Sequence, residues 1–483
     1  MSRSRIFFFT LFSFVLGIGF GSLINFQFEH LFLFSFVTLF LLVLDYKNRN
    51  VMAFCICAAV FLFGFWMVRQ AIMQTERLKF LGSTIDGEVT MLASSQTASS
   101  QRVVFEDAER KIKIAANIAQ YPAYEYGIVA HVSDCMLEKV ENKNEQIDYR
   151  MLMAKDGVVY TCKKPHITYV SDTGGNVLLR NILAARNSIE KNLTKLLPEP
   201  EATLAVGILL GGSGGFSKEM QNAFSRTGMT HVVAVSGYNV SIIVQYLLLA
   251  GIGIGLWRKQ AIWFALFGII AFVLMAGSPA SAVRAAVMGA IILWAMGCGR
   301  LSNSANALLL TAAIMLLFNP LLLRWDIGFE LSFFATLGII LIYPLLENQL
   351  IEKNKLFGIV EAVTLTLSAQ VLVLPIILIN FKTISIISVL ANVLVLPLIP
   401  LAMLLVFLAV LAGFVFQPLA FLFAYVAYVP LYLCIECIKL LSDLSFASVQ
   451  IEGVGYGLVC LYYCLVGLLF YAYKKYAPPK TDS

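Results

Sequence analysis

The chain has 483 residues, of which 59% are hydrophobic and 13% are charged, with a formal net charge of +6. Soluble globular chains carry about 45–50% apolar and about 25% charged residues, so this composition excludes a water-soluble protein, a disordered chain and a disulfide-rich secreted scaffold. A single hydrophobic core stops growing at roughly 250–300 residues, so the apolar excess must face lipid, and the sequence predicts a polytopic α-helical membrane protein with about 12 spans.

Residues 1–70 are predicted to form a three-span membrane segment with the apolar runs Ile6–Ile24, Leu31–Leu44 and Val51–Val68. No small-residue cleavage site follows the first run, which is therefore interpreted as a span and not as a removed leader. Basic residues precede the first run and lie between the second and the third. Because such residues stay in the cytoplasm, the N-terminus is expected inside and the third span is expected to end outside.

The composition changes after the third span. Residues 76–197 hold 16 Lys plus Arg and 15 Asp plus Glu, and no long apolar run. Short alternating stretches such as 111–115 and 127–132 have the period of two that predicts strands, so residues 76–173 are expected to form a small extracytoplasmic sheet or barrel. Residues 176–197 carry apolar side chains at steps of three and four, which predicts an amphipathic helix that lies in the outer interface or lines a polar path.

Residues 202–473 are predicted to hold nine further spans. Basic residues near 258, 300 and 353 and in the tail 474–483 then all fall on the cytoplasmic side, so both termini are expected inside. The stretch Val206–Phe216 is too short to cross and rich in glycine, which makes it a candidate for a re-entrant segment. The predicted spans are Val232–Trp257, Ile262–Ala276, Val283–Cys298, Ala305–Leu323, Ile327–Leu346, Leu356–Ile379, Ile384–Leu411, Phe416–Leu440 and Val454–Tyr473.

Cysteine and histidine usage bounds the chemistry. Of nine cysteines, Cys135 and Cys162 are the only two in the predicted outer domain, where the oxidising side permits a disulfide that the sequence leaves open. The others are interpreted as small buried hydrophobes. The sequence holds no phosphate-binding loop motif and only four histidines, so no cofactor and no metal site are expected. Energy for transport must then come from a partner, a gradient or the cargo.

The most informative stretch runs from Gly211 to Val240. A glycine-rich loop precedes Ser217, a good N-cap, and the short helix after it is expected to stop at Gly228. Polar side chains then enter an apolar segment, where they usually face a cavity or one another. The residues of interest there are His231, Ser236, Gly237 and Asn239.

Three stretches carry a family resemblance. Residues 224–240, F-S-R-T-G-M-T-H-V-V-A-V-S-G-Y-N-V, resemble the central signature of the ComEC competence family, the inner-membrane channels for DNA uptake in natural transformation. Gly277–Met288 resembles that family's glycine/serine turn followed by Arg-Ala and Met, and Asp326–Gly338 resembles its G-F-Q-L-S-F-x-A-T-x-G. The order, the spacing and the preceding outer domain, an OB-like barrel in the family, agree as well.

The chain departs from the family pattern at several positions. Asn239 stands where many members have His, Glu330 where Gln is usual, and Gly212 where an Asp commonly follows the glycine. Long members end in a metallo-β-lactamase-like domain proposed to degrade the non-transported strand. Only Lys474–Ser483 follows the last predicted span here, and no H-x-H-x-D-H motif is present. A short form is therefore expected, with the nuclease activity either on another chain or dispensed with.

The resemblance implies a bacterial inner-membrane channel that imports single-stranded DNA and is not itself an enzyme. The implied partners are an outer DNA receptor, a cytoplasmic ATPase or helicase, single-strand-binding proteins and a separate nuclease, all working at the lipid bilayer. The candidate residues of the DNA path are Arg226, His231, Ser236, Gly237, Asn239, Arg284, Asp326, Glu330 and Gln370.

Charged residues within predicted spans permit more than one interpretation. Arg284 could contact phosphate, pair with Asp326 or Glu330, or reach the interface. Asp326 and Glu330 lie four residues apart on one helical face, so they would repel unless one binds a cation, holds a proton or pairs with Arg324 or Arg284. Gln370 lies near a proline in an apolar run and could line a channel or form an interhelical hydrogen bond.

Two alternatives to a DNA channel remain. His231 and Ser236 could be base and nucleophile of an intramembrane serine hydrolase or protease, although residues five apart on one helix point to different faces. A small-solute permease is the third interpretation, but no internal inverted repeat is visible and the outer domain would lack a purpose. OB-like barrels often bind single strands, so nucleic-acid contact by the outer domain is a further hypothesis. The small net charge of this domain instead favours a solvated surface.

Overall fold

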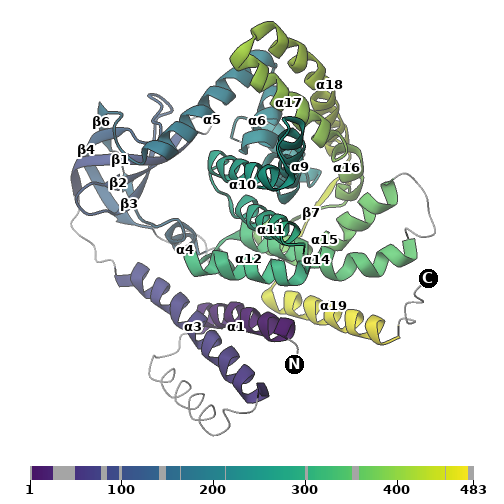
Figure 1. Cartoon of the computed structure of the whole chain (residues 1–483). Coiled ribbons are helices and arrows are strands. Elements are labelled where there is room, and N and C mark those ends of the chain that lie inside the picture. The colour runs from purple at the N-terminus through teal and green to yellow at the C-terminus, as the bar shows by residue number, and fades with distance from the viewer. Residues whose placement is uncertain are drawn as a thin grey trace.

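The computed structural model describes residues 3–24, 49–77, 84–96, 100–140, 148–163, 165–212, 214–299, 303–350, 358–451 and 453–476. Ten helices in this part of the chain are long and apolar enough to cross a membrane. The chain is therefore a multi-pass helical membrane protein, as the composition predicts. Figure 1 shows a small β-domain at one side of the helices.

The β-domain follows α1 (Arg3–Leu23) and α3 (Arg49–Arg77). Its strands pair in the order β1-β2-β3-β5-β4, and a β1–β4 pairing closes the ring, while β6 adds to β4. Strands β3 and β5 run parallel, and the other pairs are antiparallel. The prediction of an inserted OB-like barrel is confirmed. The elements are β1 (Thr84–Gln96), β2 (Gln101–Asp107), β3 (Lys113–Ile118), β4 (Val129–Lys139), α4 (Tyr149–Ala154), β5 (Val158–Lys163) and β6 (His166–Ser171).

Alternation builds the barrel core. Along β2 the side chains of Val103 and Phe105 are fully buried, while their neighbours are half-buried. They pack inside the barrel with Ile114, Val132 and Tyr160 from three other strands. Side chains two apart on a strand share a face, which is why this short-period pattern marked the domain in the sequence.

The remaining elements form the helical part of the molecule. In chain order they are α5 (Val177–Leu196), α6 (Glu201–Leu210), α7 (Lys218–Arg226), α8 (Thr230–Val233), α9 (Gly237–Gly253), α10 (Arg258–Met275), α11 (Ala280–Gly297), α12 (Ser304–Phe318), α13 (Leu322–Trp325), α14 (Ile327–Leu350), α15 (Ile359–Phe381), β7 (Thr383–Ser385), α16 (Ser388–Val395), α17 (Leu398–Val415), α18 (Gln417–Ser442), β8 (Ser448–Gln450) and α19 (Tyr456–Tyr476).

Two of the predicted spans, at 305–323 and 384–411, do not match one long helix, and another lies outside the described residues. The span predicted at Ile384–Leu411 is wrong as one helix, because β7 and α16 come first and Pro397 separates α16 from α17. Proline lacks the N–H that a continuing helix needs. The span predicted at Ala305–Leu323 is a 15-residue apolar helix, α12, followed by the turn α13. The predicted span Leu31–Leu44 lies outside the described residues, as do Arg300, Lys353 and Lys355.

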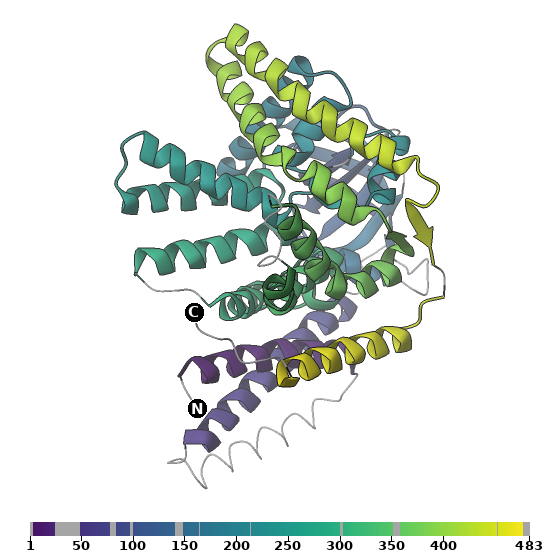
Figure 2. The ribbon, with the colours of Figure 1, turned by 90° about the vertical axis from the view of Figure 1, so that its right-hand side faces the viewer.

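Two packed groups of helices lie at opposite ends of the view in Figure 2, with other helices between them. At one end, α1 and α3 approach closely, since a Cβ on Gly64 would lie only 2.6 Å from the carbonyl oxygen of Phe14. Small residues let membrane helices approach in this way. At the other end, the antiparallel pair α17 and α18 packs with α6 and α16 around Leu204, Ile399 and Leu431, all buried.

A proline inside α15 is compensated by α19. Pro375 removes one backbone donor, which leaves the carbonyl of Val371, four residues earlier, without its usual partner. The hydroxyl of Tyr462 donates to this carbonyl at 2.9 Å, and that of Tyr463 donates to the carbonyl of Leu372 at 2.8 Å. Backbone groups freed at membrane depth need such partners, so these bonds fasten α19 to α15.

Candidate functional site

A helix interruption lies at the centre of the signature stretch. The segment predicted as one span from Val232 is two helices, because α8 ends at Val233 and α9 begins at Gly237. Ser236 is the N-cap of α9, and its Oγ accepts from the Asn239 amide at 3.3 Å and donates to Asn239 Oδ1 at 3.1 Å. A Ser before Gly favours a helix start over a continuing helix here.

Two further contacts fix the interruption in place. Asn239 is only 1% exposed, and its Nδ2 donates to the carbonyl of Ile208 in α6 at 3.1 Å. On the other side, Ser281 of α11 donates from Oγ to the carbonyl of Val235 at 2.8 Å. The side-chain amide of Asn239 therefore has a structural partner, the carbonyl of Ile208. This contact does not require a His at position 239.

Arg284 of α11 extends across to α14. Its Nε donates to Ser332 Oγ and its Nη1 to Thr336 Oγ1, each at 2.5 Å. The guanidinium carbon lies 5.9 Å from the ring centroid of Phe333. None of the ion pairs among the described residues involves Arg284, so the predicted pairs with Asp326 and Glu330 do not form. The side chain is half-buried, and its partners among the described residues are two hydroxyls, the Met288 sulfur at 3.6 Å from Nη1, and a ring.

Gly237 lies next to Nη2, the remaining nitrogen of the Arg284 guanidinium. A Cβ built on Gly237 would lie 2.6 Å from Arg284 Nη2, so any side chain here would displace the guanidinium. Nη2 makes no hydrogen bond to the described residues. It therefore lies beside the first turn of α9, where backbone N–H groups and the helix dipole also favour negative charge.

Arg186 joins two other helix ends near this place. From α5, its Nη1 donates to the carbonyl of Met275 at 2.6 Å and its Nη2 to the carbonyl of Gly211 at 3.1 Å. These carbonyls terminate α10 and α6, where a cation is favoured. Burial lowers the pKa of Arg186, and Glu190 opposes that shift. The sequence marked this residue only as part of a polar helix face, because its partners are backbone atoms.

A second polar group surrounds Gly228, which has a φ of +71° and ends the short helix as predicted. His231 Nδ1 lies 3.0 Å from the Gly228 carbonyl. A Cβ on Gly228 would lie 2.9 Å from the Cβ of Ser388, whose Oγ accepts from Gln370 Nε2 at 2.7 Å. His231 and Gln370 thus belong to one neighbourhood between α8, α15 and α16.

Arg226 makes a different contact, although it lies only two residues before Gly228 in the chain. Its Nη2 donates to the carbonyl of Leu444, beyond the end of α18, at 3.0 Å, and the residue is exposed. Nothing in this contact connects it to Arg284 or to Gln370.

The hydrolase interpretation gains no support from the geometry. Ser236 Oγ is engaged with Asn239, and His231 Nδ1 faces the Gly228 carbonyl. Among the residues that the structure describes, no hydrogen bond joins His231 to Ser236. A general base has to reach the proton that it removes, so these two side chains are not arranged as a catalytic pair.

Asp326 pairs with a residue of the β-domain. Its Oδ2 lies 2.9 Å from Lys155 Nζ, and its Oδ1 accepts from the amide of Phe329 at 2.8 Å. The expected partners Arg324 and Arg284 are thus replaced by Lys155, because the fold brings the end of α4 to the start of α14. Glu330, one turn further, is half-buried and forms no ion pair with the described residues.

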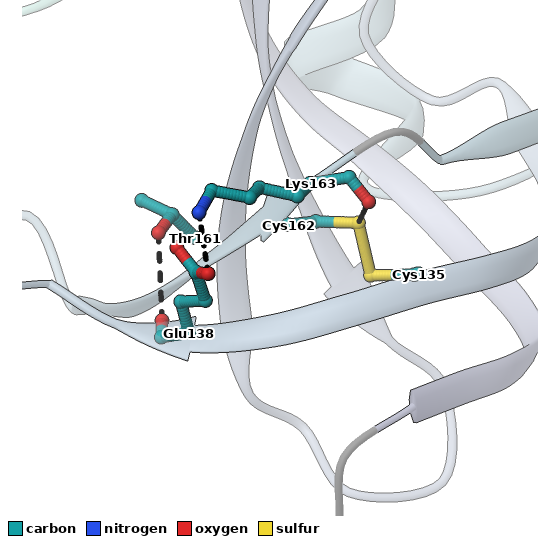
Figure 3. Close-up of a disulfide and its surroundings, with 5 residues drawn as sticks. All are labelled: Cys135, Glu138, Thr161, Cys162 and Lys163. Carbon is teal, nitrogen blue, oxygen red and sulfur yellow. Dashed lines mark hydrogen bonds and ion pairs between the residues drawn. A yellow bond between two sulfur atoms is a disulfide. The ribbon is translucent and has the colours of Figure 1, made fainter.

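The β-domain contains the disulfide that the sequence left open. Cys135 and Cys162 are bonded, with Cα atoms 5.5 Å apart, a common separation for a disulfide. Figure 3 shows it beside the exposed pair of Lys163 and Glu138, whose Nζ–Oε1 distance is 2.5 Å. In the described part of the chain, no group of three or more His, Cys, Asp or Glu residues could hold a metal ion.

The family model for competence proteins, described as "Competence protein", matches residues 208–476, which is more than half of the chain. The chain belongs to the competence protein family. ComE operon protein 3 of Bacillus subtilis (strain 168) is 29% identical over 222 residues, which are 45% of this chain and 27% of that protein. The match thus spans little more than a quarter of that relative's length. No solved structure matches the chain.

The three motifs of this competence-family chain meet at Arg284. The first contributes Gly237 at the start of α9, the second contributes Arg284 itself, and the third contributes Ser332 and Thr336 from α14. They are about 50 residues apart along the sequence and are brought together by the packing of α9, α11 and α14. We call Gly237, Arg284, Ser332, Phe333 and Thr336 the Arg284 site.

Proposed function

We propose that this chain is the inner-membrane channel through which single-stranded DNA enters the cell in natural transformation. One observation carries the proposal, namely that the three motifs of a competence-family chain converge on an arginine without a carboxylate partner among the described residues. An arginine within a membrane protein needs polar or anionic partners, and the phosphates of a DNA strand supply one anion for each nucleotide.

The geometry of the Arg284 site suits a phosphate. Guanidinium N–H donors match phosphate oxygens in a two-pronged arrangement, and Nη2 retains donors that no group of the described residues accepts. The hydroxyls of Ser332 and Thr336 fix the plane of the guanidinium before a ligand arrives. A strand passing this point would meet a fixed positive charge and the start of α9, whereas a hydrophobic wall would oppose its entry.

We further propose that both termini lie in the cytoplasm and the β-domain lies outside. The end of α12 and the start of α14 both contact Lys155 of the β-domain, so these two helix ends share one side of the membrane. The basic residues Arg258 and Lys259 begin α10 and fall on the opposite side in the span model. That arrangement agrees with the tendency of basic residues to remain in the cytoplasm.

Transport by this chain would depend on other proteins. A receptor would deliver DNA to the outer side, and a cytoplasmic ATPase or helicase, with single-strand-binding proteins, would draw the strand inward. Degradation of the second strand would fall to a separate nuclease. These partners follow from the proposed function, since the sequence contains no phosphate-binding loop motif of its own.

Uptake of labelled DNA tests the proposal. Deleting the gene should abolish uptake into the cytoplasm, and Arg284→Ala should lower it by about tenfold or more while the protein is still produced and folded. Arg284→Lys should restore only part of the uptake, because lysine lacks the planar fork. The matched control is Arg258→Ala, which removes an exposed arginine at the start of α10 and should leave uptake unchanged.

Two results would overturn these statements separately. Normal uptake without the gene would reject the channel function, and normal uptake by Arg284→Ala would reject the role of the Arg284 site alone. Labelling by a serine-reactive probe that disappears in Ser236→Ala would instead favour an intramembrane hydrolase. Transport of a small solute without any effect on DNA uptake would favour a permease.

A further inference from the structure

The helix α4 is enclosed between the β-domain and the membrane helices. On one side, Met153 packs against Ala115 and Val158 on the outside of the barrel. On the other, Met151 and Ala154 belong to a buried core that includes Phe329 and residues of α1, α3 and α12. Figure 1 shows α4 in this position, between the strands and α12.

This arrangement occupies the surface with which OB-like barrels usually bind strands. Such barrels present the outer side of their second and third strands to nucleic acid. Here Arg102 of β2 donates from Nη1 to the Tyr149 hydroxyl at 3.4 Å and from Nη2 to Met153 Sδ at 2.5 Å. Ala115 of β3 points outward and is yet only 2% exposed. The barrel therefore uses this surface to hold α4, and the basic Arg102 is committed to that contact.

Lys155, at the end of α4, contacts α14 through its side chain and the end of α12 through its backbone. Its Nζ lies 2.9 Å from Asp326 Oδ2, and the side chains of Lys155 and Asp326 are 15% and 14% exposed. The Lys155 carbonyl accepts from Asn319 Nδ2 at 2.8 Å. Burial lowers the pKa of Lys155, but the attraction and hydrogen bonds of Asp326 and of the neighbouring Asp156 together outweigh it, so the pKa lies above its ordinary value.

The Asp326 carboxylate also lies at the start of α14, the helix whose Ser332 and Thr336 accept hydrogen bonds from Arg284. Asp326 Oδ1 accepts from the Phe329 amide in the first turn of α14. The ring of Phe329 stacks on that of Phe333 with centroids 4.2 Å apart, and Phe333 lies beneath Arg284. Two packed turns thus separate Lys155 from the groups that orient Arg284, and a buried ion pair is stiff enough to fix their position.

We propose that the Lys155–Asp326 ion pair is a positioning contact through which the β-domain holds α14, and with it Ser332 and Thr336, in register with Arg284. The β-domain then acts on the transport site through α4 and does not bind the strand with its second and third strands. The effect on uptake rests on the function proposed above, whereas the mechanical coupling does not.

Amide hydrogen exchange of the purified full-length protein tests the coupling without DNA. Lys155→Met should raise exchange of the amides from Phe329 to Thr336 on the order of tenfold, since an unpaired buried carboxylate loosens the first turns of α14. Lys155→Arg should restore protection. Lys163→Met, which breaks the exposed pair with Glu138 in the same domain, should leave α14 unchanged.

DNA uptake provides the second measurement. Lys155→Met should lower uptake on the order of tenfold, and Lys155→Arg should restore it. Asp326→Asn keeps an oxygen for the Phe329 amide and loses the charge, so the double variant Lys155→Met with Asp326→Asn should be no worse than the poorer single variant.

In these two measurements, three results would overturn the inference. They are unchanged exchange in α14, a rise confined to α4, and effects of Lys155→Met and Asp326→Asn that simply add. If uptake is normal even when the gene is deleted, the proposed function fails, but the exchange measurement still decides the coupling. Binding of single-stranded DNA across β2 and β3 of the full-length protein would also contradict it, since α4 would then have to leave that surface.

Discussion

Arg284 is oriented by side chains that satisfy only part of its guanidinium group. Nε and Nη1 donate to two hydroxyls of α14, and a ring lies beneath the plane. A guanidinium carries five N–H donors, so donors remain for a ligand once these two bonds are made. Because the side chain is already fixed, binding an anion would lose little rotamer freedom.

Gly237 provides the sharpest test at the residue scale. Gly237→Ala puts a Cβ 2.6 Å from Arg284 Nη2, which is the far end of a flexible side chain. The guanidinium should therefore move, and the fold should remain. We expect DNA uptake to fall about tenfold while the melting temperature in detergent changes by only about 2–4 °C or less, which corresponds to about 1 kcal/mol or less in a large domain.

Gly253→Ala is the matched control for this substitution. Gly253 ends the same helix, α9, and a Cβ there meets nothing within 4 Å. It should leave both uptake and melting unchanged. Equal uptake by Gly237→Ala and the wild type would show that the position of Arg284 does not matter for transport.

At the scale of elements, the interruptions of helices decide where the polar residues lie. The sequence predicts the stop at Gly228 because glycine accepts a positive φ, whereas the break before Gly237 lies in an apolar stretch where Ser236 is the one local signal, as an N-cap. Tertiary contacts stabilise that break. Asn239 bonds to α6 and Ser281 bonds to the Val235 carbonyl, so the backbone groups freed there are satisfied by other helices.

The barrel has its own element-scale prediction. The disulfide closes a segment with a sequence separation of 27, so replacing Cys135 and Cys162 by Ser should lower the free energy of unfolding of the β-domain by about 3–4 kcal/mol. Chemical unfolding of the purified full-length protein, with and without reductant, measures this change. The wild type should respond to reductant and the double variant should not.

The exposed residue Cys298 serves as the control for this measurement. Cys298→Ser removes a free thiol at the end of α11 and should change neither stability nor the response to reductant. Alkylation of Cys135 in unreduced protein would show that the bond does not form in the cell.

For the whole molecule, the span model makes a topology prediction. In a background without other reactive thiols, Thr168→Cys on exposed β6 should react with a membrane-impermeant maleimide in intact spheroplasts. Lys259→Cys, in the first turn of α10, should react only after permeabilisation. The reason is that basic residues remain in the cytoplasm, which places the β-domain on the other side. The reverse labelling pattern would invert the orientation and reject external capture of DNA by this route.

Much of the architecture was predictable because it depends on local pattern. Apolar runs gave most spans, a period of two gave the barrel strands, and Ser217 gave the start of α7. The single span across 384–411 was wrong, since the hydrophobicity of that stretch hides a strand, a short helix and Pro397. Hydropathy measures preference for lipid and cannot show how many elements share an apolar stretch.

The site was predictable only as a set of residues. Motifs selected Gly237, Arg284, Ser236 and Asn239, and the structure brings Gly237 to Arg284, whereas Arg226 bonds to the Leu444 carbonyl and Asp326 pairs with Lys155. Arg186 and Lys155 were missed, because their partners are backbone carbonyls or a carboxylate about 170 residues away along the chain. No local signal marks such partners.

By itself the sequence determined that the chain lies in a membrane, that it carries a small barrel, and which family it resembles, since composition, periodicity and motif spacing are properties of short segments. Only the tertiary structure decided that three distant motifs meet at Arg284 and that the β-domain contacts α14 through Lys155 at the end of α4. The physical reason is that a charge half-buried among helices takes its role from the groups around it, and those groups are chosen by packing.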